Sequence, residues 1–545
     1  MAGFLRKIVG ILRGISFHKT TYFMNIKSSI ASTLMLLSLS CSSIKKTNES
    51  RLSSPDTAMT PGTKYIKFHR DGSLVYIPDE KGNIIPDFSR VGYANGNSDI
   101  PEVAVVKTIE ATGTAVDQEN IQNAIDEVSK READKSGFKG AILLKKGLYS
   151  VSSNLKIQAG GIVLKGEGDS ENGTKILFTA VKQLPLLAVG GIGNVKEIPG
   201  TRVKITDAFV PVGSVAFNVS TAKSFIVGDK IILYRPATDQ WITDLKMNQI
   251  VERQGTKQWQ ASEYNLMYER VITKVEGNKV FIDNPVVMEM EPKYGGGEIY
   301  KYEFNGRIDK VGIENIYMQS EYKTDTDEEH GWDAISFNKI ENSWIRNVTA
   351  RHFGYSCVNL GREAKNISVL NSKCFDQKSQ ITGGRRYSFN NDGQLNLFMN
   401  CHATDGRHDF VTGAKVNGPN AFVNCTAKRT HADIGPHHRW ASGTLYDNIV
   451  TEGDINVQDR GQMGSGHGWV GITQILWNCT VRRAAVQVPY VNGMNYAIGV
   501  KGEKALGHFK DRPQGYWEAH NQTVQPQSLY LAQLQDRKKK NSKHQ

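Results

Sequence analysis

The second half of the chain alternates short apolar runs with polar turns, and an Asn recurs at one place in each unit. The recurring positions are Asn315, Asn347, Asn371, Asn400, Asn424, Asn448 and Asn478. Successive positions lie 24 residues apart in three intervals and further apart in the others, which is typical of a solenoid with loop insertions on one side. The runs, such as residues 421–426, are too short and too β-branched for paired helices. The pattern predicts a parallel β-helix.

A stacked file explains why Asn recurs. At a sharp bend between strands its amide can bond the backbone and the equivalent Asn of the next coil, about 4.8 Å away. Cys401, Cys425 and Cys479 each directly follow one of these Asn residues. Because the chain has no Cys-x-x-Cys spacing, we interpret them as an interior file of small apolar side chains rather than as metal ligands.

An amphipathic segment near residue 120 predicts a helix that covers the end of the solenoid. Over residues 117–130 it places Ile121, Ala124, Ile125 and Val128 on one face, and Asp117 is the expected N-cap. The strand phrases GAILLKKGLYSV and GGIVLKGEGDSENGTKILF follow it. GEGDSENG resembles a phosphate loop only superficially, because it lacks the Gly-Lys-Ser/Thr ending.

Between residues 200 and 302 the Asn repeat is absent, which predicts a β-rich insertion beside the coils. Its Trp241 and Trp259 either form a sugar-stacking platform or pack inside the insertion. The expected divisions of the chain are a leader at 1–41, a tether at 42–62, an N-terminal segment with the first coils at 63–199, the insertion at 200–302, the main coils with the active site at 303–500, and a C-terminal segment with a basic tail at 501–545.

Residues 114–178, with the phrases DQENIQNAIDEV, GAILLKKGLYSV and IVLKGEG, resemble the opening of the pectate-lyase-like right-handed parallel β-helix superfamily. Together with the Asn repeat, the resemblance covers most of residues 100–500. It implies an all-β, right-handed parallel β-helix. The resemblance does not specify the activity, since polysaccharide lyases, glycoside hydrolases and phage tailspikes share that fold.

The N-terminus carries a predicted export signal. The stretch MNIKSSIASTLMLLSLSC, from Met24, has a lone Lys27, an apolar run and a small Ser40 before Cys41. It is similar to a bacterial lipoprotein signal, although Ser38 stands where such signals usually have Leu; an ordinary cleaved leader is the alternative. We therefore expect a cell-envelope lipoprotein of the outer membrane or periplasm, otherwise a secreted protein, resembling the carbohydrate-degrading lipoproteins of Bacteroidota-like bacteria.

The Cys count and the apolar runs indicate whether disulfides or membrane-spanning helices are expected. If Cys41 is lipidated, five Cys residues remain, an odd number that implies no disulfide framework. After residue 45 no apolar run approaches the roughly 20 residues that cross a bilayer. The lipid anchor is then the expected membrane contact, and we expect a monomer.

The net charge of +12 suggests nucleic acid at first sight, but it is concentrated at the ends of the chain. Residues 1–40 carry five Lys or Arg and no acid, and residues 536–545 add a net +4, which leaves +3 for the body. Basicity therefore matters only where it is gathered locally, and no nucleic-acid partner is expected.

Positive charge is gathered in residues 378–439. Seven residues after three successive repeat Asn residues stand Lys378, Arg407 and His431, which predicts a basic column along the coils. The same window holds five of the 13 His residues and only four acids. This favours an anionic polysaccharide as partner, with Arg407, His431, His437, Lys378, Arg385 and Lys415 as candidate binding residues.

The GPHHRW stretch at residues 435–440 is the strongest candidate for chemistry, because adjacent His and Arg residues follow a Gly-Pro turn. In β-elimination from a uronic acid the sugar carboxylate is neutralised, a base removes the C5 proton, and the C4 oxygen leaves. Arg439 and Arg407 suit the neutralising role, and His438 or His408 suits the base. Tyr446 is the candidate that returns a proton to the leaving oxygen.

Three alternatives stay open. A hydrolase needs two carboxyl groups, for which Asp405, Asp409 and Asp433 are available, and Gly466-His467-Gly468 is similar to the Gly-His-Gly of polygalacturonases. A carbohydrate-binding β-helix without turnover is the second. The third concerns Ca²⁺: we expect no cofactor, but residues 324–333, TDTDEEHGWD, form either a calcium-binding or a solvated acidic loop.

Overall fold

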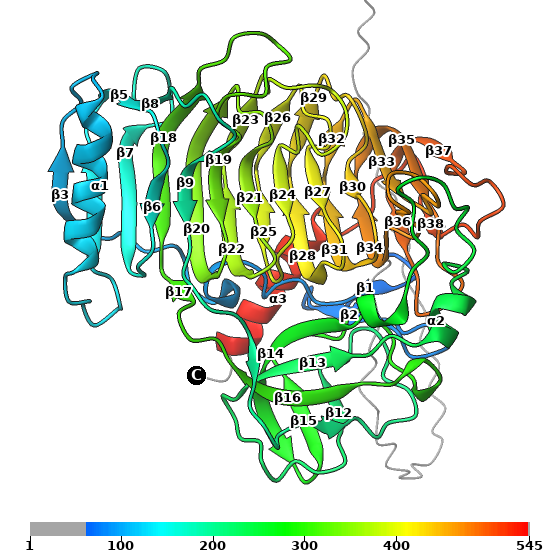
Figure 1. Ribbon diagram of the computed structural model, residues 1–545. Coiled ribbons are helices and arrows are strands. Elements are labelled where there is room, and N and C mark those ends of the chain that lie inside the picture. Colours follow the sequence, from blue (N-terminus) through cyan, green and yellow to red (C-terminus); the bar gives the residue numbers. More distant parts are fainter. Residues whose placement is uncertain (1–61, 543–545) are drawn as a thin grey trace, which may run out of the picture. The chain divides into compact units, whose positions relative to one another are not determined.

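The computed structural model describes residues 62–542 (Figure 1). The predicted leader, the lipid anchor at Cys41 and nearly all of the tether lie outside the described residues. Among the described residues no helix is long and apolar enough to cross a membrane.

Parallel strands from successive coils stack along the chain and form a parallel β-helix, so the predicted fold is confirmed (Figure 1). The first coils contain β3 (Val105–Ile109), β4 (Gly140–Leu144), β5 (Gly147–Val151), β6 (Leu155–Ile157), β7 (Ile162–Gly168), β8 (Thr174–Phe178) and β9 (Pro185–Val189). The sheet β6-β9-β19-β21-β24-β27-β30, parallel throughout, carries the candidate site described below.

The central and last coils follow the insertion. The central coils contain β17 (Ile308–Asp309), β18 (Gly312–Ser320), β19 (Asp333–Phe337), β20 (Ile340–Arg351), β21 (Ser356–Leu360), β22 (Ala364–Leu370), β23 (Lys373–Phe375), β24 (Phe389–Asn391), β25 (Leu397–Met399), β26 (His402–Thr404), β27 (Phe410–Thr412), β28 (Asn417–Val423), β29 (Thr426–Lys428) and β30 (Gly435–Pro436). The last coils contain β31 (Ala441–Asp447), β32 (Val450–Thr451), β33 (Asp454–Val457), β34 (Gly471–Trp477), β35 (Thr480–Val486), β36 (Tyr496–Ile498), β37 (Lys501–Ala505) and β38 (Tyr516–Glu518).

Most of the recurring Asn residues form the predicted ladder, but the Asn478 amide donates to backbone oxygens of the C-terminal segment instead. Each of the seven has a left-handed backbone, with φ between 50° and 56°, a conformation that Asn tolerates better than most residues. Amide groups bond from coil to coil, as from Asn347 Nδ2 to Asn315 Oδ1 at 2.9 Å and from Asn400 Nδ2 to Asn371 Oδ1 at 3.1 Å. The bend and the stacking thus have the same cause.

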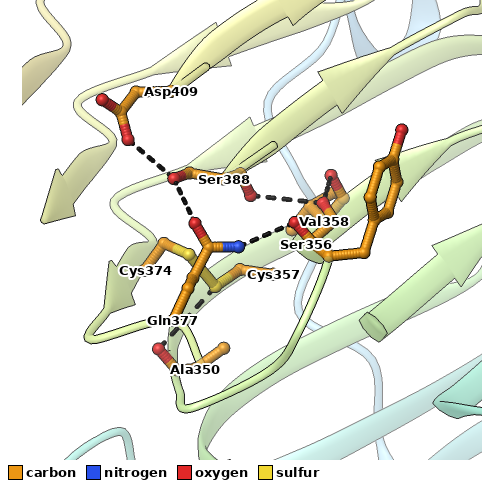
Figure 2. Close-up of a disulfide and its surroundings, with 9 residues drawn as sticks. Ala350, Ser356, Cys357, Val358, Cys374, Gln377, Ser388 and Asp409 are labelled. Carbon is orange, nitrogen blue, oxygen red and sulfur yellow. Dashed lines mark hydrogen bonds between the residues drawn. A yellow bond between two sulfur atoms is a disulfide. The ribbon is translucent and has the colours of Figure 1, made fainter. Parts of the chain in front are cut away.

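The Cys residues fulfil one expectation and contradict another. Cys401, Cys425 and Cys479 are free and buried in the main core, as the interior file predicts. The inference of no disulfide was wrong, because Cys357 and Cys374 are bonded to each other (Figure 2). Both lie in the core, 17 residues apart along the chain, where β21 and β23 bring them together.

Helix α1 (Val116–Ser129) covers the first coil with its predicted apolar face. The N-cap is Ala115 and not Asp117, which lies buried in the first turn. The carboxylate of Asp117 accepts hydrogen bonds from the backbone N–H groups of Thr112 at 2.8 Å and Ser150 at 3.0 Å. Asp117 therefore joins the helix to β5 instead of capping it.

The insertion is an antiparallel sheet that runs from residue 196 to residue 303 and shares its core with Trp440, Trp469 and Ile472 of the coils. It contains β10 (Lys196–Glu197), β11 (Val203–Lys204), β12 (Ala216–Asn218), β13 (Lys230–Arg235), α2 (Asp239–Asp244), η2 (Ala261–Glu263), β14 (Leu266–Glu276), β15 (Lys279–Ile282), η3 (Pro292–Tyr294) and β16 (Glu298–Glu303). Trp241 and Trp259 are 0% and 3% exposed and pack against Trp440 of the coils, so they form no sugar platform.

Both ends of the described chain pack on the outer face of the coils. The segment with β1 (Ile66–Phe68), β2 (Leu74–Tyr76) and η1 (Tyr93–Gly96) shares a core with α3 (Leu529–Ser542) and with β25, β28, β31 and β34. The expected basic tail is therefore helical as far as residue 542. Its Arg537 is buried and donates hydrogen bonds to Ser89 Oγ and to the backbone oxygen of Gly96.

Candidate functional site

Four imidazole rings from three consecutive coils lie in contact; we call His408, His437, His438 and His467 the histidine cluster. The ring centroids of His408 and His437 are 4.4 Å apart, those of His437 and His467 are 5.1 Å apart, and those of His438 and His467 are 5.0 Å apart. The parallel register of β27 and β30 brings His408 beside the GPHHRW stretch. The predicted proximity of His408 to that stretch is therefore present in the structure.

Asp433 contacts one member of the cluster, His408, and the neighbouring Arg460. Its carboxylate Oδ1 is 3.3 Å from His408 Nδ1, and its Oδ2 is 3.4 Å from Arg460 Nη1. The Asn456 amide donates to the same Oδ2 at 3.2 Å. Burial alone raises the pKa of Asp433, but the hydrogen bond from His408 and the positive charges of His408 and Arg460 bring it far below its usual value. Asp433 therefore stays ionised.

Three members of the cluster, His437, His438 and His467, are neutral imidazoles at pH 7. Burial lowers the pKa of His438 to about 4 and that of His467 to about 3, and neighbouring Arg and His charges act in the same direction. Burial also lowers the pKa of His437, whose Nδ1 lies 3.4 Å from the donor Nη1 of Arg460 and so acts as an acceptor. The Nδ1 atoms of His438 and His467 and the Nε2 atom of His408 have no hydrogen-bond partner among the described residues. All three nitrogens are buried.

Two guanidinium groups border the cluster without a carboxylate partner in the described part of the chain. Arg439 donates to the backbone oxygen of Ser465 at 3.0 Å, and Arg407 donates to the backbone oxygen of Gly383. Both are only partly buried. A guanidinium that bonds neutral oxygens keeps its full charge for an external anion.

The other candidate binding residues lie in different places. The neighbour of Arg407 in the preceding coil is Arg386, since Arg407 N donates to Arg386 O at 2.8 Å. Lys378 lies eight residues earlier, in the loop between Gln377 and Arg386. His431 does follow Arg407 in the next coil, since the backbone N–H of His431 donates to Gly406 O at 2.9 Å. The predicted single file of Lys378, Arg407 and His431 is therefore wrong at Lys378, because the extra residues in that coil shift the count.

Lys378 and Arg385 are also neutralised by the acidic loop. Lys378 Nζ lies 2.9 Å from Asp325, and Arg385 Nη2 donates to Glu328 at 2.9 Å. The loop is thus ion-paired rather than simply solvated. Among residues 62–542, no group of three or more His, Cys, Asp or Glu side chains is arranged to hold a metal ion.

Lys415 and Tyr446 do not join the cluster as expected. Lys415 Nζ donates to the backbone oxygen of Glu263 at 2.7 Å and faces the insertion. Tyr446 is 0% exposed and stacks on Phe422 inside the coil, and burial raises its pKa. Its predicted proton-donating role is wrong, because residues along β31 alternate inward and outward and this one points inward.

Sequence reasoning missed Tyr387 and Arg460 as members of the site. The Tyr387 ring lies 5.0 Å from His408 and 5.5 Å from His437. Burial raises its pKa, so its hydroxyl keeps its proton at neutral pH. No local motif marks either residue. Only the coil register, which places Tyr387 one coil before His408, would have revealed the first.

Two neighbouring hollows lie over the later coils, and the first of them reaches Asp433. One, of about 540 Å³, is lined by residues that include His431, Asp433, Glu452, Arg460 and Arg482. The next, of about 580 Å³, shares Asn456, Gln458 and Met463 with it. A groove therefore continues from Asp433 across several coils.

The carboxylates proposed for a hydrolase are not free. Asp409 is 0% exposed and accepts from Ser388 Oγ at 2.7 Å, and burial raises its pKa to about 7 (Figure 2). Asp405 pairs with Arg429. Asp433 is held as described above, so none of the three faces the hollow as an unpaired acid.

No protein-family model matches the chain, and no curated protein matches it. Among solved structures it is similar to the tailspike protein gp49 from Pseudomonas phage LKA1 (12% identity, 74% of this chain and 71% of that chain, TM-score 0.35). It is also similar to pectate lyase Pel9A (9%, 74% and 78%, TM-score 0.34) and to a polygalacturonase from Erwinia carotovora ssp. carotovora (10%, 78% and 97%, TM-score 0.32). Such low TM-scores identify neither a family nor an activity.

Proposed function

We propose that the protein is a polysaccharide lyase that cleaves an acidic, uronic-acid-containing glycan by β-elimination at the histidine cluster. The observation that carries the proposal is the pairing of neutral imidazoles with guanidinium groups that have no carboxylate partner among the described residues. This combination meets both requirements of the reaction, a proton acceptor near pH 7 and a fixed cation for the sugar carboxylate.

Each residue has a proposed role. Arg439 and Arg407 bind the carboxylate, which acidifies the C5 proton by stabilising the charge that develops next to it. His438, whose side chain is partly exposed, takes the C5 proton. Tyr387, kept protonated by burial, returns a proton to the C4 oxygen as the C4–O bond breaks. Electrons of the C5–H bond then form the C4–C5 double bond.

The test is to incubate the protein with polygalacturonate, alginate, ulvan and chondroitin sulfate and to record the ultraviolet absorbance of unsaturated uronate ends. We expect absorbance to rise with at least one polymer. New reducing ends without this absorbance would instead indicate a hydrolase. Binding without either product would indicate a carbohydrate-binding protein.

Variants assign the site. His438→Gln and Arg407→Ala should each lower kcat/KM at least about 100-fold, the range typical of a lost acid–base or charge-stabilising group. Lys428→Ala is the matched control, since Lys428 is an exposed residue of β29 and no ion pair holds it in the described structure. Unchanged turnover in both site variants would remove the histidine cluster from the mechanism.

A further inference from the structure

An aromatic file on the outer face of the coils leads to the histidine cluster; it consists of Trp332, Tyr355 and Tyr387. Backbone hydrogen bonds hold the three residues in neighbouring coils, from Tyr355 N to Trp332 O at 2.8 Å and from Tyr387 N to Tyr355 O at 2.7 Å. Their spacing along the file is therefore set by the solenoid, at about 4.8 Å per coil.

Each ring of the file contacts the ring in the next coil. The Trp332 and Tyr355 rings are 6.3 Å apart and nearly parallel, with an interplanar angle of 10°. The Tyr355 and Tyr387 rings are 5.2 Å apart at 33°, and Tyr387 contacts His408 and His437. A row of ring contacts, partly exposed at Trp332 and Tyr355 and buried at Tyr387, thus joins Trp332 to the proposed reaction centre.

Trp332 and Tyr355 remain accessible although they are large aromatic side chains. Both are partly exposed, whereas Trp241, Trp344, Trp440, Trp469 and Trp477 are fully buried. Gly354 explains the position of Trp332, because a Cβ at residue 354 would lie 2.6 Å from the indole ring. The absence of a side chain at this position lets the indole lie against the backbone of the next coil.

One border of the file is charged. The loop that starts at Gln377 and ends at Arg386 bonds the file backbone, through Gln377 Nε2 to Tyr355 O at 2.7 Å and Arg386 N to Gly354 O at 3.3 Å. This loop carries the paired Lys378 and Arg385. Flat apolar faces bordered by charged and polar groups suit a sugar ring, which has an apolar C–H face and a polar rim.

We infer that Trp332 and Tyr355 are sugar-stacking subsites, and that a polysaccharide lies along the coils with successive sugar units on the aromatic file before it enters the histidine cluster. The inference rests on the proposed function for the direction of the chain. The binding surface itself does not depend on which reaction follows.

Affinity electrophoresis through gels that contain polygalacturonate, alginate, ulvan or chondroitin sulfate tests this surface without turnover. We expect at least one polymer to retard the wild-type protein. Trp332→Ala and Tyr355→Ala should each weaken the apparent affinity about tenfold, as expected for an aromatic anchor worth more than 1 kcal/mol. Trp332→Phe should retain most of the affinity, which separates loss of the ring from misfolding.

Tyr322→Ala is the matched control, because Tyr322 is 38% exposed and contacts His352 and Lys378 without joining the file. Retardation by none of the polymers, unchanged affinity in both alanine variants, or an equal loss in Tyr322→Ala would overturn the inference. Retardation that requires Trp332, without unsaturated product from any polymer, would remove the lyase and leave the subsites. Unsaturated product with unchanged affinity in both alanine variants would remove the subsites and leave the lyase.

Discussion

Asp433 connects the electrostatics of the candidate site to its geometry at the scale of a single residue. Its carboxylate faces His408 on one side and Arg460 on the other. Asp433→Asn keeps the size of the side chain but removes the charge that orients both partners. We expect kcat to fall on the order of 100-fold, because His408 packs against Tyr387, the proposed proton donor, and a shift of His408 would misplace that hydroxyl. Steady-state kinetics on the polymer found to be cleaved measures this.

The matched control for that variant is Asp405→Asn, which removes an ion pair with Arg429 one coil earlier without touching the cluster. Its kcat should stay within about twofold, as expected for a partly exposed pair. Equal losses in the two variants would mean that charge in this region, and not the Asp433 contacts, affects turnover.

His438 predicts how stability depends on pH. Its pKa is about 4 in the folded protein, below the ordinary value of 6.5, so the unfolded chain binds its proton first as the pH falls. Its contribution is therefore intact above pH 6.5 and is lost between pH 6.5 and about 4, by roughly 3 kcal/mol. Asp409, raised to about 7, acts in the opposite sense, because its contribution is intact below the ordinary pKa and is lost as the pH rises through 7.

Urea unfolding at pH 7 and pH 5 measures the His438 effect. His438→Gln should lose less stability than the wild type on acidification, while His69→Gln, at an exposed position, should behave like the wild type. An identical acid loss in His438→Gln and the wild type would contradict the assigned burial of a neutral imidazole.

At the scale of the element, the sequence could predict what repeats and could not predict what interrupts the repeat. The Asn ladder and the cap helix followed from spacing, because each obeys a local geometric rule. The basic column failed at Lys378, because the loop between Gln377 and Arg386 adds residues that counting from Asn371 cannot see. Tyr387 was missed for the same reason, and Tyr446 was misplaced because the side of a strand depends on its register.

The disulfide gives a prediction for the coil formed by β21 and β23. Cys357 and Cys374 close a loop of 17 residues and join β21 to β23 (Figure 2). A loop of about this length corresponds to about 3 kcal/mol in the chain-entropy account. The double variant Cys357→Ala/Cys374→Ala should lose that amount in urea unfolding. Cys401→Ala, a free thiol in the same core, is the comparison, and a loss no larger than its own would contradict a stabilising cross-link.

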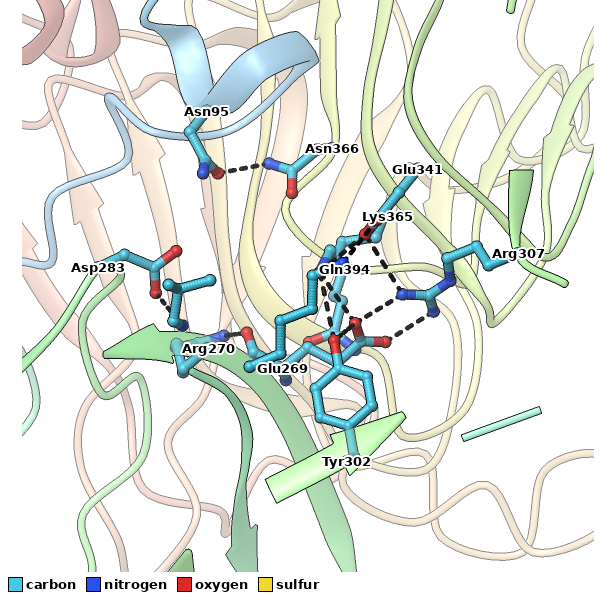
Figure 3. A network of polar contacts seen from close by, with 12 residues as sticks. Asn95, Glu269, Arg270, Asp283, Tyr302, Arg307, Glu341, Lys365, Asn366 and Gln394 are labelled. Carbon is cyan, nitrogen blue, oxygen red and sulfur yellow. Dashed lines mark hydrogen bonds and ion pairs between the residues drawn. The ribbon is translucent and has the colours of Figure 1, made fainter. Parts of the chain in front are cut away.

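At the scale of the whole described chain, the insertion and the coils meet through a buried ion network. Glu269 of β14 lies 2.7 Å from Arg307 and 2.9 Å from Lys365 of β22, and Glu341 of β20 lies 3.1 Å from the same Lys365 (Figure 3). Although burial raises the pKa of both carboxyl groups, the charges of Lys365 and Arg307 bring that of Glu269 far down, and those of Lys365 and Lys230 bring that of Glu341 to about 2. All four groups therefore stay charged across the neutral range.

Glu269→Gln should be strongly destabilising for this reason, because it leaves Arg307 and Lys365 buried with too little negative charge. Breaking one partner of a buried pair costs about 3–5 kcal/mol, whereas losing an exposed pair costs about 0–1 kcal/mol. Glu276→Gln, which removes the exposed pair of Glu276 with Lys274, is the control. Chemical unfolding should give the large loss of stability only for Glu269→Gln.

Limited proteolysis of Glu269→Gln is a second test, because Glu269 belongs to the insertion and Lys365 to the coils. We expect fragments of the insertion to be released first. Release of coil fragments first would mean that the network does not join the insertion to the coils.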